Sequence, residues 1–405
     1  MLAFPDDRRG TLPHAGPMKN SAQLTRRGLL RTCIVLAGSA GLAGVLGACG
    51  GPQAASPAAS AVTSPSTAVA SATASTAASV ATSAAAKAGG LRKVRYGLTG
   101  PSQPPFVSIG QGYFAEQGIE LELSRFDSAQ DAIAPLGAGQ LDAVGGAVGA
   151  GLWNAVARGV PIKLVADLGH TDATPPGFPQ QELLVRKPLF DQGAVKSIAD
   201  IKGLKVGVPR KGTSVEYAMV KMLQKGGITT KDFELIEIAP TEFAVTMSNG
   251  KVDAAFAIQP AATTLLNEGI AAHMMYDWEA APDNQSIGVV FGPQFANSDL
   301  ATPFMTAFLK GVRLYNDAFL KKDPAAREKV IDAVVKYGPV KDRSIYEKQA
   351  WFVGIDPDGK LRLPNLQEQQ EYFLSTGTQT TRLDFGKIVD SHFAEQAVAK
   401  LGPYK

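Results

Sequence analysis

The feature that most restricts the fold is a set of landmarks that recurs further along the chain. Three pairs of residues carry it: Gly97 and Gly207, Gly118 and Gly227, and Asp142 and Asp253. The members of these pairs are 110, 109 and 111 residues apart, respectively. Such a constant offset predicts two lobes built on the same plan, and a single large sheet would contradict it. The alternative is chance, because short loops of α/β proteins favour glycine.

From residue 93 onward, short apolar runs alternate with segments of helical length, which is typical of an α/β fold with mostly parallel strands. A first series of strands is predicted at 94–98, 119–125, 143–146, 162–167 and 183–185. A second series is predicted at 205–208, 233–238, 254–258 and 272–275, with a return strand at 287–291. Helices are predicted between them, for example at 107–117 and 215–225, and the tail from 299 to 401 is predicted to be helical.

These elements predict one lobe from residues 92–188 together with 284–405, and a second lobe from residues 189–283. Ligands of open α/β sheets bind beyond the carboxyl ends of the strands. We therefore expect a ligand cleft between the lobes, lined by the loops that lead from strands into helices.

Three motifs carry a family resemblance: Tyr96-Gly97, the segment GYFAEQGIEL at 112–121, and the segment GQLDA at 139–143. Together they resemble the substrate-binding proteins of importers for nitrate, sulfonates, taurine and thiamine-pyrimidine precursors, over residues 93–319. The resemblance implies a type II periplasmic-binding-protein fold that closes over a small solute. It also implies delivery of that solute to an ABC permease driven by an ATPase, without naming the solute.

The amino-terminal segment reads as an export signal. Arg26 and Arg27 lie in a stretch that resembles the twin-arginine motif, and an apolar run from 34 to 48 follows. The run ends in Leu-Gly-Ala before Cys49, which resembles a bacterial lipobox. Residues 1–48 are thus predicted to be removed and Cys49 to be lipidated at the outer face of the cytoplasmic membrane. A retained transmembrane helix is the alternative, but the run is shorter than the roughly 20 apolar residues that a span needs.

The composition of the chain after the predicted leader excludes several kinds of site and partner. Residues 49–91 are mostly Ala, Ser, Thr, Pro and Val, which predicts a disordered tether. The chain has two cysteines, Cys33 in the leader and Cys49 at the lipidation site, so no disulfide or thiol nucleophile is expected in the folded part. A net charge of +3 over 405 residues gives no sign of nucleic-acid binding. We expect a monomer without a cofactor.

The loop Lys211-Gly212-Thr213-Ser214 precedes a predicted helix. Thr213 or Ser214 could cap that helix, and free backbone amides there would favour an anion. The resemblance to sulfonate-binding proteins implies that Gly212, Thr213 and Ser214 hold the anionic group of the solute. The alternative is a plain helix cap with Lys211 in solvent.

Further candidate ligand-binding residues lie at other strand ends: Gly100, Ser102, Gln103, Gly146, Ala147, Val148, His170 and Gln259. Small residues would let backbone amides approach a ligand, or they only pack a strand against its helix. His170 is expected at the edge of the cleft as a donor, or simply at the surface. Gln259 precedes a proline before which many relatives carry an aromatic or acidic residue.

An enzyme is the less favoured class. A fungal branch of the superfamily makes a pyrimidine with pyridoxal phosphate, but it requires a cysteine-rich motif that this chain lacks. The chain also has no nucleophile elbow, paired-histidine metal motif or P-loop. A ligand-sensing lipoprotein on the same fold stays open as an alternative. Neighbouring genes for a permease and an ATPase would favour the importer.

Overall fold

The computed structural model describes residues 90–405 except 100–102, 127, 173–178, 209–210 and 348–352. Contacts divide the chain into two units, 1–81 and 82–405, and the described residues all belong to the second. The predicted leader, Cys49 and the tether up to residue 89 lie outside the described residues. Within the described part, none of the helices is both long enough and apolar enough to cross a membrane.

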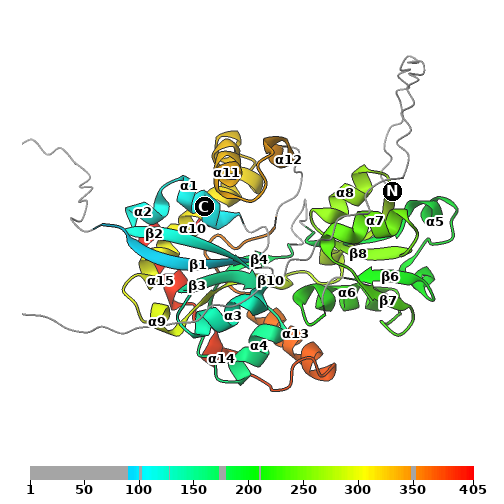
Figure 1. The fold of residues 1–405 in the computed structure, drawn as a ribbon, viewed down its shortest axis with the longest axis horizontal. Coiled ribbons are helices and arrows are strands. Elements are labelled where there is room, and N and C mark those ends of the chain that lie inside the picture. Colours follow the sequence, from blue (N-terminus) through cyan, green and yellow to red (C-terminus); the bar gives the residue numbers. More distant parts are fainter. Residues whose placement is uncertain (1–89, 100–102, 127, 173–178, 209–210, 348–352) are drawn as a thin grey trace, which may run out of the picture. The chain divides into compact units, whose positions relative to one another are not determined.

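The described strands form two five-stranded sheets, and both appear in Figure 1. The first sheet has the order β2 (Ile119–Phe126), β1 (Arg92–Thr99), β3 (Ala143–Ala147), β10 (Gln285–Phe291) and β4 (Lys163–His170). The second has the order β7 (Glu234–Glu237), β6 (Lys205–Val208), β8 (Ala254–Ile258), β5 (Gln181–Arg186) and β9 (Ala271–Tyr276). In both sheets three parallel strands are followed by an antiparallel strand and an edge strand. The predicted two lobes of one plan are confirmed.

The repeated aspartates have the same structural role in both lobes. The Oδ2 atom of Asp142 accepts a hydrogen bond of 2.7 Å from the backbone nitrogen of Arg95 in β1. The Oδ2 atom of Asp253 accepts one of 3.2 Å from the backbone nitrogen of Lys205 in β6. Each carboxylate therefore ties the entry of β3 or β8 to the neighbouring parallel strand, which explains why aspartate recurs at this offset.

One strand lies in a different lobe from the one that the sequence predicted. The segment 183–185 was expected to close the first lobe, but β5 pairs with β8 and β9 in the second sheet. The chain therefore crosses to the second lobe between β4 and β5 and returns to the first lobe between β9 and β10. The first strand after each crossing, β5 or β10, is the antiparallel strand next to the three parallel strands of its sheet. Hydrophobic periodicity shows that a strand exists but not which sheet it joins, and this is why the expected boundary at 188 was wrong.

Helices cover both faces of the first sheet. One face packs against α1 (Pro104–Gly110), α2 (Tyr113–Glu116), α10 (Ala301–Phe319), α11 (Pro324–Tyr337) and α15 (His392–Leu401). The other packs against α3 (Ala129–Gly137), α4 (Ala150–Ala157), α13 (Leu363–Ser375) and α14 (Phe385–Ile388). The single helix predicted at 107–117 is two helices, because Gly112 has a φ of 73° that ends the first of them.

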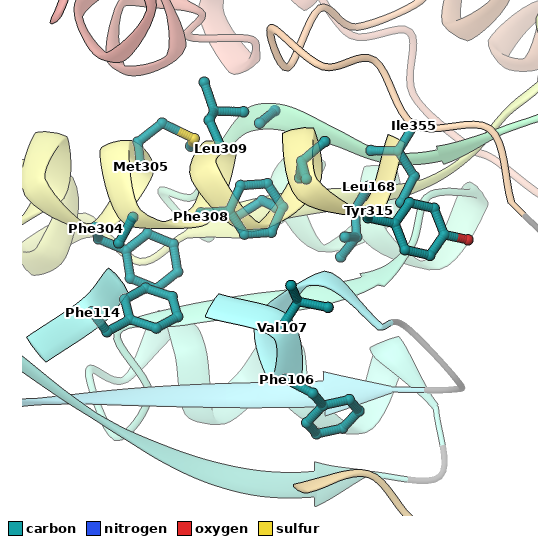
Figure 2. Close-up of a cluster of buried hydrophobic side chains, with 14 of the residues drawn as sticks. Phe106, Val107, Phe114, Leu168, Phe304, Met305, Phe308, Leu309, Tyr315 and Ile355 are labelled. Atoms are coloured by element: carbon teal, nitrogen blue, oxygen red, sulfur yellow. The ribbon is translucent and has the colours of Figure 1, made fainter. Parts of the chain in front are cut away.

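Aromatic packing holds α10 against the first sheet. Figure 2 shows Phe304 of α10 directed at Phe114 of α2, with ring centroids 5.2 Å apart. The ring of Phe304 also lies 5.9 Å from that of Tyr96 in β1 and 5.5 Å from that of Phe291 in β10. The carboxy-terminal helical segment is therefore part of the first-lobe core.

The second sheet is covered in the same way by shorter helices. α6 (Ser214–Lys225) packs on one face through Met219, Met222 and Leu223. α7 (Phe243–Ser248) and α8 (Ala261–Asn267) cover the other face. The remaining helical elements are α5 (Lys187–Asp191), α9 (Pro293–Ala296), α12 (Arg343–Glu347), η1 (Ile198–Ile201), η2 (Pro240–Glu242) and η3 (Asp277–Glu279).

Candidate functional site

The loop after β6 forms a closed cap on α6. Thr213 is the N-cap residue, and its Oγ1 atom accepts a hydrogen bond of 3.4 Å from the backbone nitrogen of Glu216. The Glu216 side chain reaches back, and its Oε2 atom accepts a hydrogen bond of 2.6 Å from the backbone nitrogen of Gly212. Ser214 is only 1% exposed. This is close to a capping box, in which side chains satisfy the first free amides of a helix.

The backbone amide of Lys211, just before Gly212 in the same loop, also has a carboxylate partner. The backbone nitrogen of Lys211 donates a hydrogen bond of 3.2 Å to Oε1 of Glu237, at the end of β7. The sequence-based expectation of free amides at this loop was therefore wrong for Lys211 and Gly212. The physical reason is that the helix N-terminus attracts negative charge, and acidic side chains of the chain itself supply that charge.

The first lobe meets this loop directly. The backbone nitrogen of Ala150, the first residue of α4, donates a hydrogen bond of 3.0 Å to the carbonyl oxygen of Gly212. Gly149 and Thr213 form an isolated antiparallel bridge. A Cβ atom at Gly149 would lie 2.7 Å from the carbonyl oxygen of Gly212, so the absence of a side chain permits this approach. The loops after β3 and β6 thus come together, as the sequence predicted.

Of the three residues just before Gly149, two are buried and one is exposed. A Cβ atom at Gly146 would lie 2.8 Å from Oγ1 of Thr99 and 2.9 Å from Cβ of Ala129, so Gly146 lets the strand pack tightly. Val148 is fully buried, whereas Ala147 is exposed. Of the three predicted ligand-binding residues in this turn, only Ala147 presents its side chain to solvent.

Helix α13 connects the first lobe to α6 of the second. The hydroxyl group of Tyr217 in α6 donates a hydrogen bond of 2.6 Å to Oε2 of Glu368 in α13. The rings of Tyr217 and Tyr372 lie edge to face at 6.0 Å. Burial, together with the charge of Glu216 and a hydrogen bond to it, raises the pKa of Tyr372. The Glu216 carboxylate, which accepts from Gly212 in its own loop, is thus close enough to α13 to affect the charge of Tyr372.

The two segments that cross between the lobes are paired with each other. The backbone nitrogen of Thr171 donates to the carbonyl oxygen of Asn284 at 3.1 Å, and the backbone nitrogen of Asn284 donates to Oγ1 of Thr171 at 2.8 Å. The Nδ2 atom of Asn284 also donates to the carbonyl oxygen of Ser214, at 3.2 Å. The crossing thus lies beside the amino-terminal end of α6.

His170 belongs to a buried network and not to the edge of a cleft, which corrects the prediction. Its Nδ1 atom lies 2.7 Å from Oδ2 of Asp167, and its Nε2 atom lies 2.9 Å from Nη2 of Arg362. Because a guanidinium only donates, Nε2 accepts from Arg362, and Nδ1 is left to donate to Asp167. His170 is 2% exposed and Asp167 is fully buried.

The side chain of Gln259 also forms hydrogen bonds within the protein. Its Nε2 atom donates a hydrogen bond of 2.7 Å to Oε1 of Glu182, and its Oε1 atom accepts one of 2.8 Å from the hydroxyl group of Thr263. The second oxygen of Glu182 lies 3.1 Å from Nδ1 of His273. Gln259 therefore links β5, β8 and α8 at the carboxyl edge of the second sheet, and its predicted role as a direct ligand is not needed to explain its position.

Gly100 and Ser102 lie outside the described residues. Gln103 precedes α1, and its carbonyl oxygen accepts hydrogen bonds from the backbone nitrogens of Phe106 and Val107, at 3.0 and 3.2 Å. Its side-chain oxygen is enclosed without a hydrogen-bond partner in the described part of the chain. Gln103 is thus a polar group at the carboxyl end of β1 with unused hydrogen-bonding capacity.

The sequence did not predict that acidic residues bind the amides of the loop after β6, or that α13 lies beside α6 at the candidate site. The spacing of Thr213 and Glu216 is that of a capping box, so the role of Glu216 was readable from the sequence. Tyr372 and Glu368 lie more than 140 residues away from α6, and no local pattern connects them to it. Among the described residues, no group of three or more His, Cys, Asp or Glu side chains is arranged to hold a metal ion.

The two sheets and their strand orders define a two-lobed periplasmic-binding-protein fold. The sequence profile described as NMT1/THI5 like matches residues 102–325, more than half of the chain. The chain belongs to the NMT1/THI5-like family.

Two of the solved structures with the same fold are named as binding proteins, and their sequence identity to this chain is low. The aliphatic sulphonate-binding protein SsuA of Escherichia coli is 16% identical, with a TM-score of 0.59 over 74% of this chain and 92% of that one. The nitrate-binding protein NrtA of Synechocystis PCC 6803 is 13% identical, with a TM-score of 0.59 over 77% of this chain and 89% of that one. At these identities the likeness shows the fold alone.

A relative detected by sequence is named only as a binding protein. It comes from Brucella abortus and is 27% identical over 150 residues, which are 37% of this chain and 41% of that protein. The match thus spans less than half of the relative.

Proposed function

We propose that this chain is the solute-binding component of an ABC importer, which captures a small organic solute outside the cytoplasmic membrane and delivers it to a permease and its ATPase. The observation that carries the proposal is the approach of the loop after β3 to the loop after β6, where the nitrogen of Ala150 meets the oxygen of Gly212. Ligands of open α/β sheets bind at such strand ends, between lobes that close over them. Sulfonates and pyrimidine precursors are solute classes that the family resemblance suggests, and sulfonates also stand in the names of two fold relatives. Carboxylates are a further class of small organic solute that a cleft with helix-terminus donors would accept.

A solute screen tests this proposal. The protein purified with Cys49→Ser, to keep it free of lipid, is heated in the presence of single solutes from these classes. A solute that binds the native state raises the unfolding temperature by mass action, by an amount that grows with its concentration. Calorimetry then measures the affinity of each solute found. If no small organic solute stabilises the protein, the proposal is contradicted.

The anchor is proposed separately, since it rests on the leader and on Cys49. Replacing Cys49 by serine is expected to abolish membrane association while the unfolding temperature of the folded part stays unchanged, because the lipid attaches outside the core. Labelling of growing cells with a radioactive fatty acid checks it. Label in the serine variant equal to that in the parent would show that the lipid attaches elsewhere.

A further inference from the structure

Three aromatic side chains form a stack where β9 ends, at the carboxyl edge of the second sheet. The His273 and Tyr276 rings have centroids 4.0 Å apart, and the Tyr276 and Trp278 rings lie nearly parallel, at 14° and 5.8 Å. All three side chains are half-buried, and 33% of the His273 side chain is exposed, so a molecule in solvent can reach this aromatic stack. In the described part of the chain, no lysine or arginine lies over these rings.

A buried carboxylate lies directly behind the aromatic stack. Glu182 is 3% exposed, its Oε2 atom lies 3.1 Å from Nδ1 of His273, and its Oε1 atom accepts a hydrogen bond of 2.7 Å from Gln259. A buried carboxylate is costly unless a positive charge pairs with it. Among the described residues, only His273 forms an ion pair with Glu182, and it is charged only when protonated. The one arginine of β5, Arg186, pairs with Asp253 at the other end of the strand.

The turn after β9 holds the aromatic stack in place. The Oδ2 atom of Asp277 accepts a hydrogen bond of 3.0 Å from the backbone nitrogen of Gln181 in β5, and its Oδ1 atom accepts one of 2.9 Å from that of Trp278. The Oε1 atom of Glu279 accepts a hydrogen bond of 2.8 Å from the backbone nitrogen of Tyr276. The rings are therefore positioned by the turn itself, before any ligand arrives.

We propose that the aromatic stack in front of Glu182 is a subsite for a flat, positively charged group of the solute, such as an amidinium or a guanidinium. The inference rests on the proposed function and narrows its solute class. The faces of aromatic rings attract cations, and a flat cation can stack on a ring while the carboxylate behind the stack attracts its charge. The subsite lies at the carboxyl edge of the sheet, where ligands of open α/β sheets bind.

Three probes of nearly equal shape separate charge from stacking: benzamidine is a cation, benzamide is neutral and benzoate is an anion. Each is titrated into the full chain with Cys49→Ser and 15N-labelled tryptophan, so that the indole signals in NMR spectra report both affinity and place of binding. The chain has three tryptophans, and Trp278→Leu identifies the signal of Trp278. Benzamidine is expected to shift that signal and to bind at least about tenfold more tightly than benzamide, with benzoate the weakest.

Glu182→Gln keeps the shape of the side chain and removes its charge. The preference of this variant for benzamidine over benzamide should fall to within about threefold. Glu234→Gln, at an exposed position of β7, is the matched control and should keep the preference of the parent. If Glu182→Gln does not fold, Trp278→Leu decides, because loss of the ring should weaken benzamidine binding at least about tenfold in calorimetry.

Three results would overturn the inference: benzamidine binding no tighter than that of benzamide, a Trp278 signal that stays unshifted at high benzamidine concentration, or a full preference for benzamidine in Glu182→Gln. Absence of binding by all three probes would overturn it as well. None of these results affects the solute screen, which uses other compounds, so the failure of this inference is distinguishable from that of the proposed function.

Discussion

Replacing Asp167 by alanine is expected to lower the free energy of unfolding by about 3–5 kcal/mol, the range for breaking a buried charged network by removing one partner. The carboxylate accepts four hydrogen bonds: from the backbone nitrogens of Gly169 and Asp356, at 2.8 and 2.7 Å, from Nε2 of Gln285, at 2.6 Å, and from His170. Alanine would leave these donors buried without that acceptor. Urea unfolding followed by circular dichroism measures the change.

The control is Asp299→Ala, because the ion pair of Asp299 with Arg92 is exposed and such pairs contribute about 0–1 kcal/mol. A loss for Asp167→Ala no larger than that of the control would show that the network does not stabilise the fold.

Because of the Asp167 carboxyl group, the free energy of unfolding is also expected to depend on pH. Burial raises the pKa of Asp167, but the contact with His170 and the hydrogen bonds from Asp356 and Gln285 outweigh it, so the pKa lies below its ordinary value. A lowered pKa in the folded state gives stability that is present above the unfolded pKa of about 3.9 and is lost as the pH falls. The parent should therefore lose more stability than Asp167→Ala between pH 7 and pH 3.

Replacing Gly149 by valine is expected to weaken solute binding by about a hundredfold while the free protein remains folded. A Cβ atom there would lie 2.7 Å from the Gly212 oxygen and 3.3 Å from Cα of Thr213, both backbone atoms that cannot turn aside. The closed arrangement of the lobes then becomes rare, and the apparent affinity falls in proportion to the population that is able to bind. Calorimetry with a solute identified in the screen measures it.

Gly90→Val is the control for this change, since a Cβ atom at Gly90 would meet nothing within 4 Å. The unfolding temperature of Gly149→Val without solute should match that of the parent, because open lobes relieve the clash. An unchanged affinity in Gly149→Val would mean that the contact between the two loops is absent from the bound state.

The fold was readable from the sequence wherever a local pattern determines the structure. The offset between Asp142 and Asp253 reflects one hydrogen bond that is made in each lobe, so the repeat in sequence is a repeat in structure. The sheet that β5 joins was not readable, because it depends on where the chain crosses and not on the residues of the strand.

The candidate site could be predicted only in part, because some of its contacts join residues that are far apart in the sequence. The loops around Gly149 and Gly212 were found because small residues at strand ends mark turns into helices. His170 was placed wrongly because its partner Arg362 lies 192 residues away, and nothing near His170 indicates burial. Glu216 fits a capping box by spacing, but its contact with Tyr372 depends on the packing of α13 against α6.

Small-angle X-ray scattering with and without a solute from the screen is the most direct test of the central claim that this chain closes over a small molecule. The measurement uses the full chain with Cys49→Ser and a solute concentration far above the measured dissociation constant. The radius of gyration is expected to be smaller in the complex, because hinged lobes rotate toward each other around a bound solute. An unchanged radius at saturation would contradict the claim and would indicate a rigid site.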